Sequence, residues 1–132
     1  MTDQLMTIRE MCDKYDVTPR ALRFYEAKEL LFPIREGTKR LFTKSDRARL
    51  TLILRGKRFG FSLEEIRQLL DLWEGGKGRY VQLAKTCEVA ETHLAEMKAR
   101  RAELDAAIGE LEDQIKWGRD ELTKSEAQAT AA

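Results

Sequence analysis

The sequence has few of the residues that build catalytic and metal centres. Its 132 residues include one histidine, His93, and two cysteines, Cys12 and Cys87, which lie far apart and form no CxxC motif. This arrangement disfavours a structural disulfide and gives no zinc-binding spacing. No His/Cys/Asp grouping and no phosphate-cradling glycine loop is present either. We therefore expect no enzyme, no cofactor and no metal site.

Long hydrophobic runs are missing too. No segment is long enough to cross a bilayer, and no signal peptide opens the chain, so we expect a cytoplasmic protein. Apolar residues make up 42% and charged residues 36% of the chain, which is typical of a protein rich in exposed helix. The length allows one domain plus an extension, or one elongated domain.

The net charge of +1 hides an uneven distribution along the chain. Residues 1–62 carry 14 lysines and arginines against 8 acids, a balance of +6. Residues 63–132 carry 10 against 15, a balance of −5, and the two balances sum to +1. A basic N-terminal half joined to an acidic C-terminal half is typical of a nucleic-acid-binding head on a stalk that does not bind.

Residues 18–30 are predicted to form a helix with an apolar face and a cationic face. Thr18 suits the N-cap and Pro19 the first helical position, where its missing N–H costs nothing. Leu22, Leu30 and one aromatic residue are expected to face a core. Three side chains are expected to project away from it: Arg20, Arg23 and Tyr25. Guanidinium groups there suit DNA phosphates or a guanine edge, although an ordinary helix with a solvated basic face fits equally well.

The preceding segment completes a two-helix motif. Thr7 and Glu10 have capping-box spacing and predict a helix that follows a loose end at residues 1–6. Residues 15–17 then form a tight connection to the helix at 18–30. Two short helices joined in this way form a helix-turn-helix, whose second helix can enter the major groove.

A β-hairpin is predicted next. Residues 31–35 and 39–42 read as extended strands joined by a short turn that contains a glycine. Pro33 restricts the first strand to an edge, and so short a hairpin must lean on the helices. Lys39 and Arg40 near its tip would reach phosphates if the hairpin is a wing; alternatively, they keep an exposed edge from aggregating. Beside a helix-turn-helix we favour the wing.

Two further helices complete the basic head. Thr43 with Asp46, and Ser62 with Glu65, have capping-box spacing, and each pair precedes a run with helical periodicity. A glycine-rich stretch at 75–79 ends the second of these helices and separates the head from the stalk.

The remainder is predicted to be one long helix, from about residue 80 to 123. Apolar residues recur there at alternating steps of four and three, which is the seam of a coiled coil. The seam positions are Leu83, Cys87, Ala90, Leu94, Met97, Arg101, Leu104, Ile108, Leu111, Ile115, Gly118 and Leu122. Because the head is too small to cover the apolar seam of a helix of this length, we expect the helix to pair with a second chain. The expected domains are a head at 1–74, a hinge at 75–79, a coiled-coil helix at 80–123 and a disordered tail at 124–132.

Several polar or sulfur-containing side chains fit structural roles better than chemical ones. Cys12 and Cys87 are expected to pack as small hydrophobic residues rather than to react or bind metal. His93 lies just off the seam, where we expect it to be solvated. Arg101 is the one charge on the seam, and it either fixes the register or extends its guanidinium to water.

The order helix-turn-helix, wing, two helices and long helix resembles that of the MerR family of bacterial transcriptional regulators. The resemblance is close over residues 7–73, whereas the long helix is similar in kind only. The motifs that carry it are Arg20-Ala21-Leu22-Arg23-Phe24-Tyr25-Glu26, Leu30-Leu31-x-Pro33, Lys39-Arg40-Leu41-Phe42 and Gly60-Phe61-Ser62-Leu63-Glu64-Glu65-Ile66. The expected fold is mainly α: a winged helix-turn-helix domain with a small two-stranded wing, followed by a long coiled-coil helix.

The resemblance implies a homodimer joined by an antiparallel coiled coil, with two heads on one palindromic operator. In the family, DNA contacts come from the recognition helix, the wing and the turn before the fourth helix. The matching residues here are Thr18, Arg20, Arg23, Tyr25, Lys39, Arg40, Arg58 and Ser62. Members commonly bind between promoter elements that are too far apart for RNA polymerase. They bend and untwist the spacer and respond to an effector.

The sensor residues of the family are where this sequence departs from it. Metal sensors carry a cysteine at the start of the long helix and a cysteine-bearing loop at its end, but Cys87 lies inside the helix here. The cysteine cluster of redox members is absent from this sequence, and we expect no large ligand-binding domain of the kind that drug-sensing members carry at their C-terminus. The segments 36–42 and 54–62 look most like the branch that controls acyl-CoA and branched-chain amino acid breakdown. An effector would bind near Trp73 and Tyr80, two aromatic residues that flank the hinge.

Two functions remain open at this point. The basic winged head on a heptad stalk predicts a dimeric, operator-specific regulator that acts with RNA polymerase at a promoter. The missing sensor residues predict instead an architectural or partner-dependent DNA-binding protein without an effector switch. Binding that is nearly independent of sequence and steeply dependent on salt would identify the second.

Overall fold

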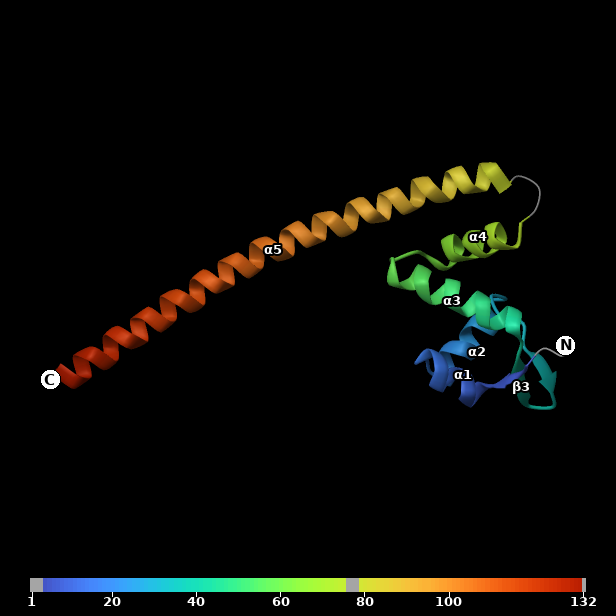
Figure 1. Ribbon diagram of the computed structural model, residues 1–132, viewed down its shortest axis with the longest axis horizontal. Helices are drawn as coiled ribbons and strands as arrows, with labels where there is room; N and C mark the ends of the chain where they lie inside the picture. The colour runs from blue at the N-terminus through green and yellow to red at the C-terminus, as the bar shows by residue number, and fades with distance from the viewer. Residues whose placement is uncertain (1–3, 76–78, 132) are drawn as a thin grey trace. The chain divides into compact units, whose positions relative to one another are not determined.

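The computed structural model describes residues 4–75 and 79–131 of the chain (Figure 1). The elements in order are β1 Met6–Thr7, α1 Ile8–Tyr15, α2 Pro19–Ala27, β2 Ile34–Glu36, β3 Lys39–Phe42, α3 Lys44–Arg58, α4 Leu63–Glu74 and α5 Arg79–Ala131. The chain divides into two units, Met1–Ala90 and Glu91–Ala132. Among the described helices, none is both long and apolar enough to cross a membrane.

Side-chain caps start the four helices of the head, as the sequence predicted. The hydroxyl oxygens of Thr7, Thr18, Thr43 and Ser62 each accept the backbone N–H three residues further on, at 3.1–3.2 Å. Three of these caps are completed by an acid that accepts the N–H of the capping residue itself. Each cap satisfies donors that the first helical turn leaves free, and such a cap contributes about 1 kcal/mol to stability.

The small sheet has three strands rather than the two that were predicted. Strand β3 lies in the middle, with β2 and β1 antiparallel on its two sides. The predicted hairpin is present, with Ile34 opposite Leu41 and Gly37 in the left-handed conformation at its turn. Its first strand is Ile34–Glu36 rather than the predicted residues 31–35. The expected loose end at residues 1–6 is wrong at Met6, which pairs with Phe42. A strand of two residues is too short to show the alternation of apolar and polar residues by which strands are recognised, and its partner β3 is distant in sequence. The pairing could therefore not be predicted from the sequence.

The core of the head lies where the helices meet the sheet. Its fully or almost fully buried apolar residues are Met11, Leu22, Tyr25, Leu30, Leu31, Phe42, Leu50, Ile53, Ile66 and Leu70. Cys12 is partly buried against this core, as predicted, and that burial raises the pKa of its thiol. Helices α3 and α4 approach closely at Gly56, where an added Cβ would lie 2.8 Å from Cγ1 of Ile66.

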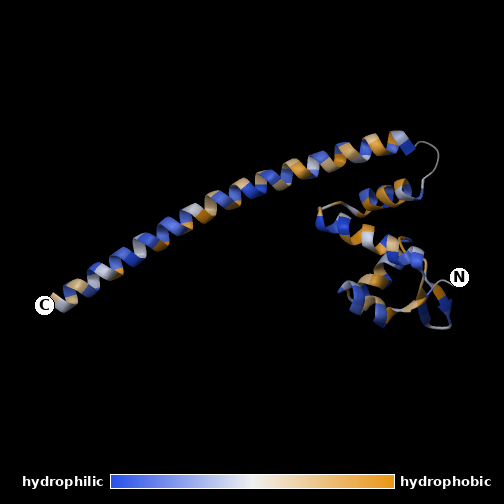
Figure 2. Cartoon of the chain, viewed as in Figure 1, coloured by the Kyte–Doolittle hydropathy of each residue, from blue (hydrophilic) through white to orange (hydrophobic). Residues whose placement is uncertain are grey.

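Helix α5 is longer than the sequence predicted. Residues 124–131, expected to be a disordered tail, continue the helix to Ala131. Alanine, glutamine and glutamate have high helix propensity, and adding them to an existing helix requires no new nucleation. Hydrophobic residues recur along α5 between hydrophilic ones (Figure 2). The predicted hinge at 75–79 falls largely on residues 76–78, which lie outside the described residues.

Candidate nucleic-acid interface

Helix α2 presents a cationic face, as predicted, but with a different aromatic residue beside it. Thr18, Arg20 and Arg23 are exposed. Tyr25 is only 2% exposed and belongs to the core, so the expectation that it projects outward is wrong. It lies three residues after Leu22 and therefore on the same side of the helix. Phe24 is the outward aromatic residue, with 44% of its surface exposed.

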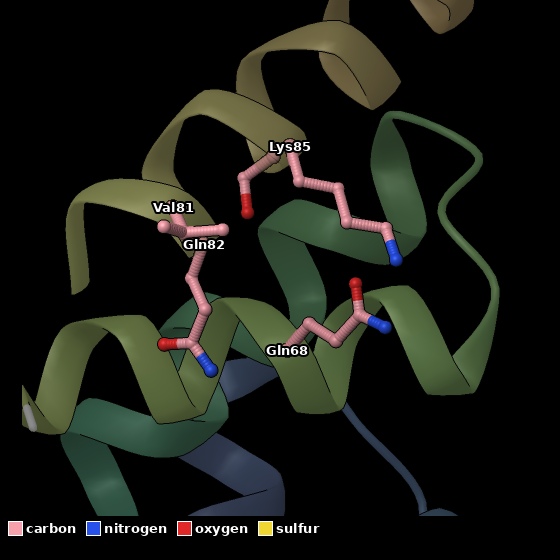
Figure 3. A pocket seen from close by; sticks show the side chains of 5 residues that line it. Gln68, Val81, Gln82 and Lys85 are labelled. Atoms are coloured by element: carbon pink, nitrogen blue, oxygen red, sulfur yellow. The ribbon is translucent and has the colours of Figure 1, made fainter. Parts of the chain in front are cut away.

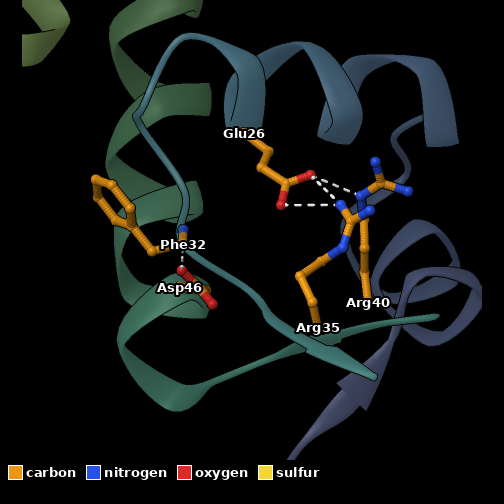
Figure 4. Close-up of polar contacts among 5 residues, drawn as sticks. All are labelled: Glu26, Phe32, Arg35, Arg40 and Asp46. Atoms are coloured by element: carbon orange, nitrogen blue, oxygen red, sulfur yellow. Dashed lines mark hydrogen bonds and ion pairs between the residues drawn. The ribbon is translucent and has the colours of Figure 1, made fainter. Parts of the chain in front are cut away.

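An ion-pair cluster fixes the wing against α2 (Figure 4). Glu26 of α2 accepts hydrogen bonds from Arg40 of β3, whose Nε lies 2.6 Å from Oε1, and from Arg35 of β2, whose Nη1 lies 3.1 Å from the same oxygen. Arg40 was predicted to bind phosphate, but its Nε is engaged within the chain and its side chain is 20% exposed. Lys39, at the start of β3, is exposed.

The ionisation of Glu26 reflects this cluster. Partial burial opposes the charged form and by itself raises the pKa of the carboxyl. The hydrogen bond and charge of Arg40, with those of Arg35, outweigh burial and hold that pKa below its ordinary value. In the sequence, Glu26 lies four residues after Leu22 in the helix predicted at 18–30. A carboxylate four residues from a buried leucine gives no sign that two wing arginines will reach it.

A buried carboxylate holds the segment that leads into the wing. Asp46 of α3 is 2% exposed, and its Oδ1 accepts the backbone N–H of Phe32 at 2.9 Å (Figure 4). Its Oδ2 accepts the backbone N–H of Thr43 at 3.0 Å. Asp46 was predicted as a cap partner, and the structure gives it this second role between α3 and the wing.

The turn between α3 and α4 adds a further cationic surface. Arg55, Lys57 and Arg58 lie in the last turn of α3, where cations complement the helix dipole. Arg58 and Ser62, both predicted to bind DNA, are exposed at the two ends of this turn. The Ser62 hydroxyl oxygen already accepts the N–H of Glu65, so its O–H remains as the donor.

Among the described residues, two hollows lie where α4 meets the start of α5. One, of about 250 Å³, is lined by Leu52, Leu69, Leu72, Trp73, Arg79 and Leu83. The other, of about 280 Å³, is lined mostly by polar residues, which are Gln68, Gln82, Lys85 and Thr86, together with Val81 (Figure 3). Of the predicted effector pair, Trp73 lines the apolar hollow, whereas Tyr80 lines neither and is 86% exposed.

The seam of α5 is exposed in the single chain. Between 40% and 62% of the surface is accessible for its large apolar residues, which are Leu83, Leu94, Met97, Leu104, Ile108, Leu111, Ile115 and Leu122. Cys87 and Arg101 on the same seam are exposed as well. In the part of the chain that the structure describes, no three histidines, cysteines or acids come together as a metal site.

Comparison with known proteins decides the family. The family model described as "MerR HTH family regulatory protein" matches residues 6–73, and the one described as "MerR, DNA binding" matches residues 47–114. The chain belongs to the MerR family. It is 37% identical to the HTH-type transcriptional regulator ZntR of Escherichia coli K12 over 101 residues, which are 75% of this chain and 70% of ZntR. It is 32% identical to CueR of Salmonella typhimurium over 106 residues, 75% and 76% of the two chains.

Solved structures of MerR regulators have the same fold. A MerR-family regulator from Bacillus cereus is 35% identical, with a TM-score of 0.59 over 77% of this chain and 76% of that one. PbrR691 of Ralstonia metallidurans, solved with lead(II), is 34% identical, with a TM-score of 0.56 over 82% and 84%. HiNmlR, which lacks a sensor domain and was solved on promoter DNA, is 24% identical with a TM-score of 0.61 over 80% and 79%, and supports the fold alone.

These findings confirm the predicted family, fold class and type of function. The protein is a DNA-binding transcriptional regulator of the MerR family, a class that is not enzymatic. The resemblance to the acyl-CoA branch stays a prediction, as do the individual DNA-contacting residues.

Proposed function

We propose that the protein acts as a homodimer on a palindromic operator within a promoter, where it bends and untwists the DNA between the polymerase-binding elements. The observation that carries the proposal is the joint exposure of cations on three parts of one head. They are Arg20 and Arg23 of α2, Lys39 of the wing, and Arg58 in the last turn of α3. RNA polymerase is the expected partner at the promoter, and the bacterial nucleoid the expected location.

In the DNA complex, helix α2 would lie in the major groove. Arg23 and Arg20 can donate paired hydrogen bonds to a guanine edge or to phosphates, and Thr18 sits at the N-terminus of the same helix. Phe24 replaces Tyr25 as the aromatic residue available to the duplex, where its ring can contact a thymine methyl group. Lys39, Arg58 and Ser62 would hold phosphates on either side and set the register.

The exposed seam of α5 supports dimerisation. An antiparallel pair that sets Leu83 against the partner's Leu122 also sets Leu94 against Leu111 and Met97 against Ile108. All of these residues are more than a third exposed in one chain alone. The same register sets Cys87 against Gly118 and Arg101 against Leu104, which gives the arginine stem an apolar neighbour while its guanidinium extends to water.

Operator binding is tested by removing Arg23. The Arg23→Ala variant should lose about 5- to 150-fold in operator affinity, the factor that corresponds to one base-contacting arginine. The matched control, Lys116→Ala, removes one exposed charge outside the seam and should keep wild-type affinity. Fluorescence anisotropy with operator and scrambled duplexes measures both, and size-exclusion chromatography with light scattering checks the dimer. Unchanged operator affinity in Arg23→Ala would count against the proposed interface.

An architectural protein without sequence preference is the second candidate. Among the described residues there is no group of metal ligands, which is compatible with a protein that lacks an effector switch. It differs in one measurable property, the ratio of operator to scrambled-DNA affinity. A ratio near one, with a steep loss of binding as salt rises, would favour the architectural function over the operator-specific one.

We infer that the effector, in an operator-specific regulator, occupies the hollow beside Trp73. Five of its six lining residues are apolar or aromatic and the sixth is Arg79, a combination that suits a small apolar acid. At about 250 Å³ it is suited to a short acyl group. In a Trp117→Phe background, titration with short-chain acids and acyl-CoAs should change the emission of Trp73. Constant emission with all of them would remove this assignment.

A further inference from the structure

We propose that Arg49 is a positioning residue that couples the end of α4 to the wing, and that Glu74 controls it. Arg49 lies on α3, yet it contacts the segment before the wing on one side and the last residue of α4 on the other. This inference deepens the proposed function, because the wing is one of the DNA-binding elements and α4 lines the proposed effector hollow.

The contacts of Arg49 toward the wing are specific. Its Nε donates to the carbonyl oxygen of Leu30 at 2.8 Å. Its guanidinium carbon lies 5.2 Å from the centre of the Phe32 ring, in the geometry of a cation–π contact. The N–H of Phe32 is bonded in turn to the buried Asp46. Residues 30–32 are therefore fixed by two side chains of α3 just before strand β2 begins at Ile34.

The contact of Arg49 toward α4 is an ion pair. Its Nη1 bonds Oε1 of Glu74, the last residue of the helix. The arginine side chain is 9% exposed and that of Glu74 is 50% exposed. Glu74 adjoins Trp73, which lines the apolar hollow. A shift of this helix end would therefore move the acid that partners a buried arginine.

The asymmetry of burial explains the direction of control. Arg49 is buried, and a buried guanidinium that loses its acid must find another acceptor or approach water. If the Arg49 guanidinium moved, its contacts with the Leu30 carbonyl and the Phe32 ring would shift or break. Arg67 of α4 also donates to the carbonyl oxygen of Lys28, at the C-cap of α2, so α4 touches the recognition helix as well. The wing-directed link, however, passes through Arg49.

The first test uses Glu74→Gln in the full-length protein without DNA. Glu74 is half exposed, so the variant should fold. Its control is Asp71→Asn, which removes an exposed acid of the same helix that has no ion pair among the described residues. Hydrogen exchange followed by mass spectrometry should show exchange at residues 30–42 faster by about two- to thirtyfold in Glu74→Gln, the range expected for coupling of this kind. Asp71→Asn should leave exchange at these residues unchanged. Equal exchange in wild type and Glu74→Gln would overturn the proposal.

The second test is a double-mutant cycle with the wing. If Glu74 acts through wing position, Glu74→Gln should weaken operator binding in the wild-type background and have no further effect in Lys39→Ala. Additive losses would contradict the coupling and indicate a general effect on stability. Failure of all variants, and of the wild type, to prefer the operator would refute the proposed function instead, while the exchange experiment would still decide the role of Arg49.

Discussion

At the scale of single residues, the head depends on a few charged side chains that connect elements distant in sequence. Glu26 joins the recognition helix to both wing strands, and Asp46 joins α3 to the segment before the wing. The lowered pKa of Glu26 means that its ionised form is stabilised by folding. This contribution is fully present above the unfolded-state pKa of the carboxyl and is lost as pH falls through the lower, folded-state pKa.

Glu26→Gln should therefore lower the free energy of unfolding by about 1–3 kcal/mol at neutral pH, because two arginines lose a charged acceptor. The difference from wild type should shrink as pH falls below the ordinary glutamate range, where the wild-type carboxyl is protonated as well. Urea unfolding of both proteins across this pH range measures it. A difference that stays constant down to the lowest pH would show that the charge of Glu26 is not what holds the wing.

At the scale of elements, local signals predicted most of the structure. Each cap is formed by residues three apart, so Thr7, Thr18, Thr43 and Ser62 could be recognised from sequence. The assignment of Phe24 and Tyr25 failed because both are aromatic, and only packing of the whole head shows which one enters the core. Pairing of Met6 with Phe42, the reach of Arg40 to Glu26 and the contacts of Arg49 depend on tertiary arrangement, which residue spacing does not reveal.

The close packing of α3 on α4 gives an element-scale prediction. Gly56→Ala should destabilise the head by about 1–3 kcal/mol, because its Cβ would meet the Ile66 side chain at 2.8 Å. In Gly109→Ala the new Cβ meets nothing within 4 Å, and the variant should gain about 0.5–1 kcal/mol from helix propensity. Thermal unfolding followed by circular dichroism compares the two. A Gly56→Ala protein as stable as wild type would mean that α4 can shift away from α3 at little cost.

At the scale of the whole molecule, the proposed function requires two chains. The seam residues of α5 are exposed in one chain, although they alternate as those of a coiled coil do. Two heads joined in this way would meet a palindrome with matching symmetry, and each head alone would have only one set of DNA contacts. Bending the DNA costs free energy of about 1–6 kcal/mol, which the contacts of both heads together would offset.

Ile108→Asp should separate the dimer. The substitution places an unpaired charge in the seam of both chains, and a penalty of about 3–5 kcal/mol would weaken dimerisation by about two to four orders of magnitude. Ala106→Asp adds the same charge on the opposite side of the helix and should leave the dimer intact. Sedimentation equilibrium measures the mass of each variant. If Ile108→Asp remains a dimer as tight as wild type, the predicted seam is not the interface.

Operator-specific binding by a dimer can be measured with a footprint of the purified protein on the DNA upstream of its own gene, taken at two salt concentrations. We expect a bounded, palindromic protected region that persists at the higher salt, with two chains bound per site. Protection that appears only at low salt and has no boundary would contradict it, because binding would then rest on the phosphate backbone alone.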